Sequence, residues 1–161
     1  MTSPSFPPAA PEVDAVLGAA NVLLRIAARS VLDVEEIVST PQLRVLILIA
    51  GSGPQNLGEV AAELGVHPSN ATRTCDRLVR SGLIRRSEDE TDRRYIQLAL
   101  TPMGADLVQH VLARRRSELS VILARMDAPD RDAVIGAFQV FADIAGVQGT
   151  SDGRFAFRLP A

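Results

Sequence analysis

Ser69, Asn70 and Arg73 lie close together in a segment that has no acidic residue between positions 66 and 75. Hydroxyl, amide and guanidinium groups form hydrogen bonds with the edges of nucleotide bases and with phosphates. Residues 66–86 hold five arginines and one acid, a local excess of +4 in a chain whose net charge is −2. Because the local field decides where a polyanion docks, we expect this segment to contact nucleic acid.

Two predicted helices with a short turn between them would position these side chains. Asn56, followed three residues later by Glu59, is a capping-box pattern that predicts a helix start, and Gly65 predicts its end. Pro68 then opens a second helix, which is expected to run to about Arg80. Only three residues separate the two helices, and a helix-turn-helix requires so short a connection.

The second helix is predicted to have one apolar and one polar side. Its apolar residues share the helical spacing of a core-facing stripe, and they are Ala71, Cys75, Leu78 and Val79. Cys75 is therefore expected to be a core residue rather than a redox switch, because a buried thiol lacks a stabilised thiolate.

The polar side of this helix holds the candidate binding residues. Side chains nearest the amino end of a recognition helix reach base edges, so we assign Ser69, Asn70 and Arg73 to bases, with Arg73 as a guanine reader. Thr72 and Arg77 are assigned to phosphates, which fix register without reading sequence. The alternative is an ordinary solvated helix face.

A hairpin is predicted to follow. Residues 83–86 form a short strand, residues 87–92 a polar and mostly acidic turn, and residues 95–100 a second strand with alternating apolar side chains. Arg93 and Arg94 lie at its tip, where an arginine gains from the negative potential of a narrow minor groove. The alternative is a surface hairpin with an incidental ion pair.

Two further helices precede this region. Residues 12–38 have the apolar spacing of one helix, after a proline-rich arm at 1–11 that is expected to be disordered. Thr40 as N-cap and Pro41 predict the next helix, whose apolar run should be buried.

Two more helices follow the hairpin. Thr101 and Pro102 open a long helix to about residue 126, and Pro129 opens a last helix to about residue 146. Arg114, Arg115 and Arg116 on the long helix are expected to form a solvated face with intersubunit ion pairs. The tail at 147–161 receives no assignment.

Composition limits the class of protein. With 47% hydrophobic residues, 4% aromatics and no Trp, the chain favours packed helices over an aromatic-rich sheet. One cysteine excludes an intramolecular disulfide and a cysteine-based zinc cluster. No cofactor-binding or catalytic pattern is visible, apolar stretches are broken by charge before they could span a bilayer, and the start lacks a charged secretory signal. We therefore expect a cytoplasmic protein without cofactor or membrane partner.

The order of elements resembles the MarR family of transcriptional regulators over residues 13–146. The segments that carry the resemblance are Leu64-Gly65-Val66-His67-Pro68-Ser69, Arg77-Leu78-Val79, Gly82-Leu83-Ile84, Asp92-Arg93-Arg94 and Leu100-Thr101-Pro102-Met103-Gly104. The hairpin signature, an Asp-x-Arg followed by an alternating strand and Leu-Thr-x-x-Gly, is the most specific part.

The resemblance implies a mainly α fold with a small β-hairpin. It places a winged helix-turn-helix lobe at 40–101 and dimerisation helices at 12–38 and 102–146. Such proteins are homodimers that bind pseudo-palindromic operators in double-stranded DNA, usually as repressors, and many respond to a small aromatic or phenolic effector or to an oxidant. It also implies that Arg94 enters the minor groove and that Asp92 holds it in position.

Two departures from the family pattern stand out. The family's peroxide sensors carry their reactive cysteine in the first helix, where this chain has none, which argues against thiol-based sensing. His67 occupies a position where serine usually caps the recognition helix, so a weaker cap is expected. A winged-helix protein-interaction module that no longer binds DNA remains the alternative to a DNA-binding regulator.

Overall fold

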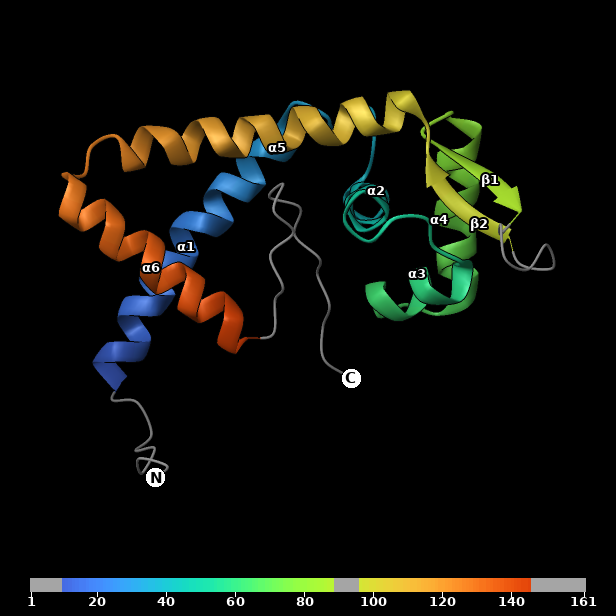
Figure 1. Cartoon of the computed structure of the whole chain (residues 1–161). Coiled ribbons are helices and arrows are strands. Elements are labelled where there is room, and N and C mark those ends of the chain that lie inside the picture. The colour runs from blue at the N-terminus through green and yellow to red at the C-terminus, as the bar shows by residue number, and fades with distance from the viewer. Residues whose placement is uncertain (1–9, 89–95, 146–161) are drawn as a thin grey trace.

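The computed structural model describes residues 10–88 and 96–145. Its elements are α1 (Ala10–Leu32), α2 (Thr40–Ser52), α3 (Leu57–Leu64), α4 (Pro68–Arg80), β1 (Ile84–Glu88), β2 (Ile96–Leu100), α5 (Pro102–Leu123) and α6 (Ala128–Ile144). In Figure 1, α5 runs along the top of the view, with α4 and the hairpin near its start, and α6 folds back beneath it from its far end. The predicted fold class, mainly α with one antiparallel β-hairpin, is confirmed.

The first helix differs from its predicted range of 12–38. It begins at Ala10, inside the predicted arm, and ends at Leu32. A hydrogen-bonded turn follows, in which Val34 and Val38 are buried in the core. The apolar spacing therefore continues past the end of the helix, because the turn and the helix pack against the same core.

Capping residues define the other helix starts. The N-cap of α2 is Ser39, not Thr40 as predicted, and its backbone N–H donates to Gln42 Oε1 at 2.8 Å. The predicted capping box of α3 is confirmed, since Asn56 Oδ1 accepts the Glu59 N–H at 2.9 Å and the Asn56 N–H donates to Glu59 Oε2 at 2.7 Å. These bonds satisfy amide groups that have no partner inside the helix.

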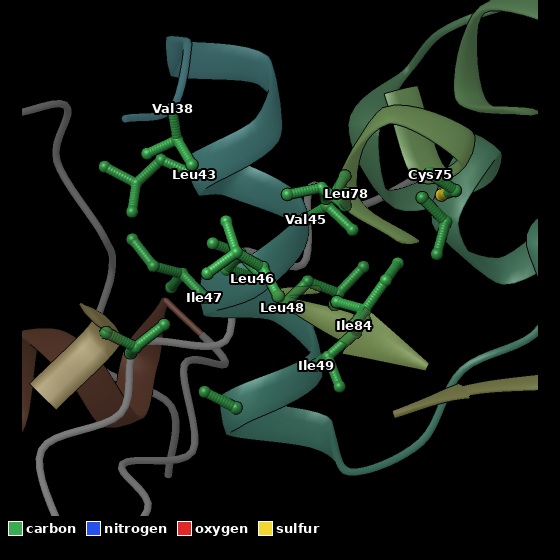
Figure 2. Close-up of a cluster of buried hydrophobic side chains, with 14 of the residues drawn as sticks. Val38, Leu43, Val45, Leu46, Ile47, Leu48, Ile49, Cys75, Leu78 and Ile84 are labelled. Carbon is green, nitrogen blue, oxygen red and sulfur yellow. The ribbon is translucent and has the colours of Figure 1, made fainter. Parts of the chain in front are cut away.

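The core is built around α2, as Figure 2 shows. Seven residues of α2 are buried, and α3, α4, β2 and α5 pack around it. Cys75 and Leu78 of α4 are fully buried in the same cluster, together with Ile84 of β1. Burial raises the pKa of the Cys75 thiol to about 11, and Asp76 adds to the shift while Arg86 opposes it. The assignment of Cys75 to the core is confirmed.

The hairpin is attached to the lobe by an isolated β-bridge. β1 and β2 are antiparallel, with Ile84 opposite Leu100, and Gln55 pairs with Leu98 through two backbone hydrogen bonds of 2.8 and 3.0 Å. Leu98 is fully buried, but Ile96, on the same side by alternation, is 54% exposed. The end of the hairpin at Ile96 therefore extends beyond the core.

A buried polar contact joins α1 to α5. Arg115 Nε donates to Ser30 Oγ at 2.8 Å, and Ser30 Oγ donates to Ala27 O at 2.7 Å. The expectation that Arg115 belongs to a solvated face is wrong, because packing of α5 on α1 half-buries the side chain and this desolvation lowers its pKa. Neighbouring Arg114 is exposed and lies 3.7 Å from Glu118 of the same helix.

Apolar side chains remain exposed on α1 and α6. Within the described part of the chain, α6 buries no residue, and Phe138, Phe141 and Ile144 are exposed. α1 is long and apolar enough to cross a membrane by length and composition, although the C-terminal half of α1 carries Arg25 and Arg29. Both helices thus present apolar surfaces that the described part of the chain leaves exposed.

Gly104 is required where α5 meets β1. A Cβ atom at this position would overlap the carbonyl oxygen of Leu83 and lie 3.0 Å from its carbonyl carbon. We expect Gly104→Ala to lower the free energy of unfolding by about 1–3 kcal/mol through overpacking, as measured by denaturant titration. Met103→Ala, at an exposed neighbour, should change it by less than about 0.5 kcal/mol. Equal effects of the two changes would contradict this account.

Cys75 should be protected from thiol reagents in the native protein. Because its pKa rises from 9.0 to about 11, the thiolate is scarce at pH 8. We expect labelling at least about a hundredfold slower than in the guanidinium-unfolded chain, measured with a chromogenic disulfide reagent. Equal labelling rates in the native and unfolded states would show that the thiol is accessible.

Candidate nucleic-acid interface

The α3–α4 pair places the candidate binding residues on the surface. Gly65 ends α3 with φ at +64°, the left-handed conformation that glycine adopts without strain, and α4 starts three residues later. On α4, Ala71 and Leu78 are fully buried, while Ser69, Asn70 and Arg73 are exposed. The helix therefore packs its apolar stripe against the core and leaves the amino end of its polar side open.

His67 is the N-cap of α4. Its Nδ1 accepts the Ser69 backbone N–H at 3.3 Å and lies 2.9 Å from Ser69 Oγ. Nδ1 acts as the acceptor in this cap, the role that a serine hydroxyl oxygen would otherwise take. The long 3.3 Å bond is consistent with the weaker cap that was expected from the sequence.

Asn70 and Arg73 are joined by a hydrogen bond. Arg73 Nη2 donates to Asn70 Oδ1 at 2.6 Å, one helical turn apart. Both side chains are exposed, so this contact brings the guanidinium and the amide together on the open side of α4. Sequence spacing places the two residues on one side of the helix, but it does not reveal which of their polar atoms are engaged.

The two threonines of α4 bond to their own helix. Thr72 Oγ1 donates to Pro68 O at 2.9 Å, and Thr74 Oγ1 donates to Asn70 O at 2.9 Å. Thr72 is half-buried, and its hydroxyl would have to rotate away from Pro68 before it could donate to a phosphate. Arg77, the other candidate phosphate ligand, is exposed.

An ion pair between Asp76 and Arg86 connects α4 to β1, and sequence reasoning missed it. Arg86 Nη2 donates to Asp76 Oδ1. Arg80, one turn later on α4, also donates to the Asp76 carbonyl at 3.3 Å. The pair links β1 of the hairpin to α4, and the Asp76 carboxylate offsets the positive charge of Arg86. The single acid inside a basic segment was the available signal, but its partner could not be chosen among several arginines.

The hairpin tip lies outside the described residues. Asp92, Arg93 and Arg94 all fall there, so their predicted roles stay predictions. The described strands β1 and β2 lie beside α4, as Figure 1 shows. Arg85 on β1 is exposed.

A pocket of about 230 Å³ lies between α2, β2 and the start of α5. Its lining is mainly apolar and includes Ile49, Leu100 and Val108, with Gln109 as a polar side chain. This is the junction between the helix-turn-helix lobe and the long helix α5.

Comparisons with known proteins agree with this geometry. The sequence profile of the MarR family matches residues 38–96. The crystal structure of RV1404 from Mycobacterium tuberculosis has a TM-score of 0.75 and 36% identity, over 89% of this chain and 99% of that chain.

Two regulators of Bacillus subtilis are also similar. The HTH-type transcriptional repressor MdtR is 36% identical over 54% of this chain, and the HTH-type transcriptional regulator YfiV is 28% identical over 65% of it. The matched segments span 56% of MdtR and 66% of YfiV. The winged helix-turn-helix geometry and these matches together place the chain in the MarR family of transcriptional regulators.

Proposed function

We propose that this regulator is a homodimeric repressor that binds a pseudo-palindromic operator. The observation that carries the proposal is the amino end of α4, where Ser69, Asn70 and Arg73 are exposed on the side opposite the buried residues Ala71, Cys75 and Leu78. Such a helix end can enter the major groove while the hairpin reaches the adjacent minor groove. In that arrangement Arg77 and Thr72 contact phosphates, and Arg93 and Arg94, supported by Asp92, reach the minor groove.

Charge supports the same assignment. The basic segment of residues 66–86 attracts phosphate even though the whole chain is slightly acidic. The similarity to MdtR, a repressor by name, favours repression over activation.

A homodimer is proposed from the uncovered apolar side chains of α1 and α6. Exposed residues on these helices include Val16, Leu24, Phe138, Phe141 and Ile144. Apolar surface of this extent favours association, and a second copy of the chain offers the matching surface by symmetry. Two α4 helices could then read half-sites about one helical turn apart.

The pocket between α2, β2 and α5 supports a response to a small molecule. Its mainly apolar lining and the single amide of Gln109 suit a small aromatic or phenolic compound. A ligand there would contact both the lobe and the long helix, so it could change the angle between them.

Replacing Arg73 tests DNA binding directly. We expect Arg73→Ala to weaken binding to a selected operator by about 1–3 kcal/mol, because a bidentate base contact is lost. Fluorescence anisotropy at several salt concentrations measures this, and affinity should fall steeply with salt. Arg125→Ala, which changes an exposed arginine in the turn after α5, should leave affinity unchanged. A wild-type chain that binds no DNA at low salt would instead favour a protein-interaction module.

A charge on α6 tests the dimer. Phe138→Glu should convert the protein from dimer to monomer, because burying an unpaired carboxylate in an apolar interface is unfavourable. Size-exclusion chromatography with light scattering reports the mass. Met103→Glu adds the same charge at a residue that is 53% exposed near the hairpin, and it should leave the mass unchanged. A wild-type mass of one chain would refute the proposed dimer.

A further inference from the structure

The ion pair between Asp76 and Arg86 lies at the level where the described part of the hairpin leaves the core. Three cross-strand pairs share one side of the hairpin, and from its base outward they are Ile84 with Leu100, Arg86 with Leu98, and Glu88 with Ile96. The first two pairs contain the buried Ile84 and Leu98, whereas both residues of the third pair are exposed. The second pair is therefore the last level at which the described strands pack against the lobe.

Two different helices are connected to the hairpin at this level. On the β1 side, Arg86 Nη2 donates to Oδ1 of Asp76 on α4. On the β2 side, Leu98 forms two backbone hydrogen bonds of 2.8 and 3.0 Å with Gln55, which directly precedes the N-cap of α3. The hairpin is thus linked to both helices of the helix-turn-helix, and the ion pair makes the link to α4.

The base of the hairpin is held by separate contacts. Thr101 Oγ1 donates to the Gly82 carbonyl oxygen at 2.6 Å, and the Thr101 N–H donates to the Leu83 carbonyl oxygen at 3.1 Å. These bonds fix the point at which the hairpin starts. A second contact further along the strands is needed to fix the direction in which the hairpin leaves the lobe.

We propose that Asp76 is a positioning residue for DNA recognition, because its carboxylate binds Arg86 and thereby sets the direction of the hairpin relative to α4. The inference rests on the proposed binding of α4 and the hairpin in neighbouring grooves. It adds a residue that acts through the hairpin rather than by its own contact with DNA. A hairpin that already has the required direction loses less conformational freedom on binding, so more of the free protein is competent to bind.

This role and simple electrostatics predict different effects of removing Asp76. It is the single acid among the five arginines of residues 66–86, so its loss raises the local excess of positive charge from +4 to +5. On charge alone, this change strengthens binding to every duplex alike. Loss of positioning instead weakens binding where the hairpin has to meet a particular groove sequence. The ratio of the affinities for operator and for scrambled DNA therefore separates the two effects.

Measurement of this ratio for Asp76→Ala in the full-length protein tests the inference. The operator is the duplex that the wild type selects from a random pool, and the competitor is a scrambled duplex of the same length, both measured by fluorescence anisotropy at one salt concentration. The side chains of the pair are 43% and 41% exposed, and an ion pair at such a site accounts for about twofold to fivefold. Because both copies of the proposed dimer lose it, the ratio should fall by about fourfold to twenty-fivefold. The affinity for the scrambled duplex should not fall.

Matched variants isolate the ion pair as the cause. Asp106→Ala removes the same charge from an exposed position on α5, and it should leave the ratio unchanged. Arg86→Ala should lower the ratio by a factor similar to that of Asp76→Ala. The double variant should lower it no further than either single change, because all three proteins lack the same interaction. Circular dichroism should show that each variant is folded.

The outcomes separate the inference from the proposed function. An unchanged ratio in Asp76→Ala, or a double variant whose loss is the product of the two single losses, would overturn the positioning role while leaving a DNA-binding protein. A wild type that enriches no sequence from the pool, even at low salt, would overturn the proposed function itself.

Discussion

Burial of α2 is the constraint on which the rest of the lobe depends. This helix is apolar on nearly every side, so it is stable only when other elements surround it. The apolar stripe of α4 provides one of those surfaces, with Cys75 and Leu78 fully buried in the common core. Because that stripe is fixed inward, the opposite side of α4 has to face solvent. The exposure of Asn70 and Arg73 thus follows from packing behind them rather than from any contact of their own.

Local electrostatics then decide what the exposed side can do. The chain carries more acids than bases, yet the helix-turn-helix region concentrates arginine. The structure divides these cations by role. Arg86 is engaged by Asp76 and holds the hairpin, whereas Arg73 is held by a neutral amide and keeps its full charge. A carboxylate at position 70 would offset that charge next to phosphate, while asparagine orients the guanidinium without doing so.

The two ends of the molecule have opposite surface properties. Near the hairpin the surface is polar and basic, while α1 and α6 expose apolar side chains. The Arg115–Ser30 bond ties α1 to α5, and Arg131 of α6 donates to the Leu123 and Met126 carbonyl oxygens at 3.1 and 3.0 Å, which satisfies the end of α5. α5 begins directly after the hairpin, with Thr101 as its N-cap, so it connects α1 and α6 to the helix-turn-helix lobe. In the proposed dimer, the spacing between the two α4 helices would therefore depend on how α1, α5 and α6 of the two copies associate.

The sequence by itself determined the features that depend on neighbours a few residues apart. The capping box at Asn56, the turn at Gly65 and the apolar stripe of α4 are of this kind, because their partners lie within one or two helical turns. Only the tertiary structure decided the partners of Arg86 and Arg115, which lie 10 and 85 residues away in the chain. It also decided where α1 ends. Val34 and Val38 are buried in the core although they lie in the turn after the helix, and a continued helix could have buried them as well. The spacing of apolar residues in the sequence indicates which residues are buried. The backbone conformation and the long-range partners depend on how whole helices and strands pack together.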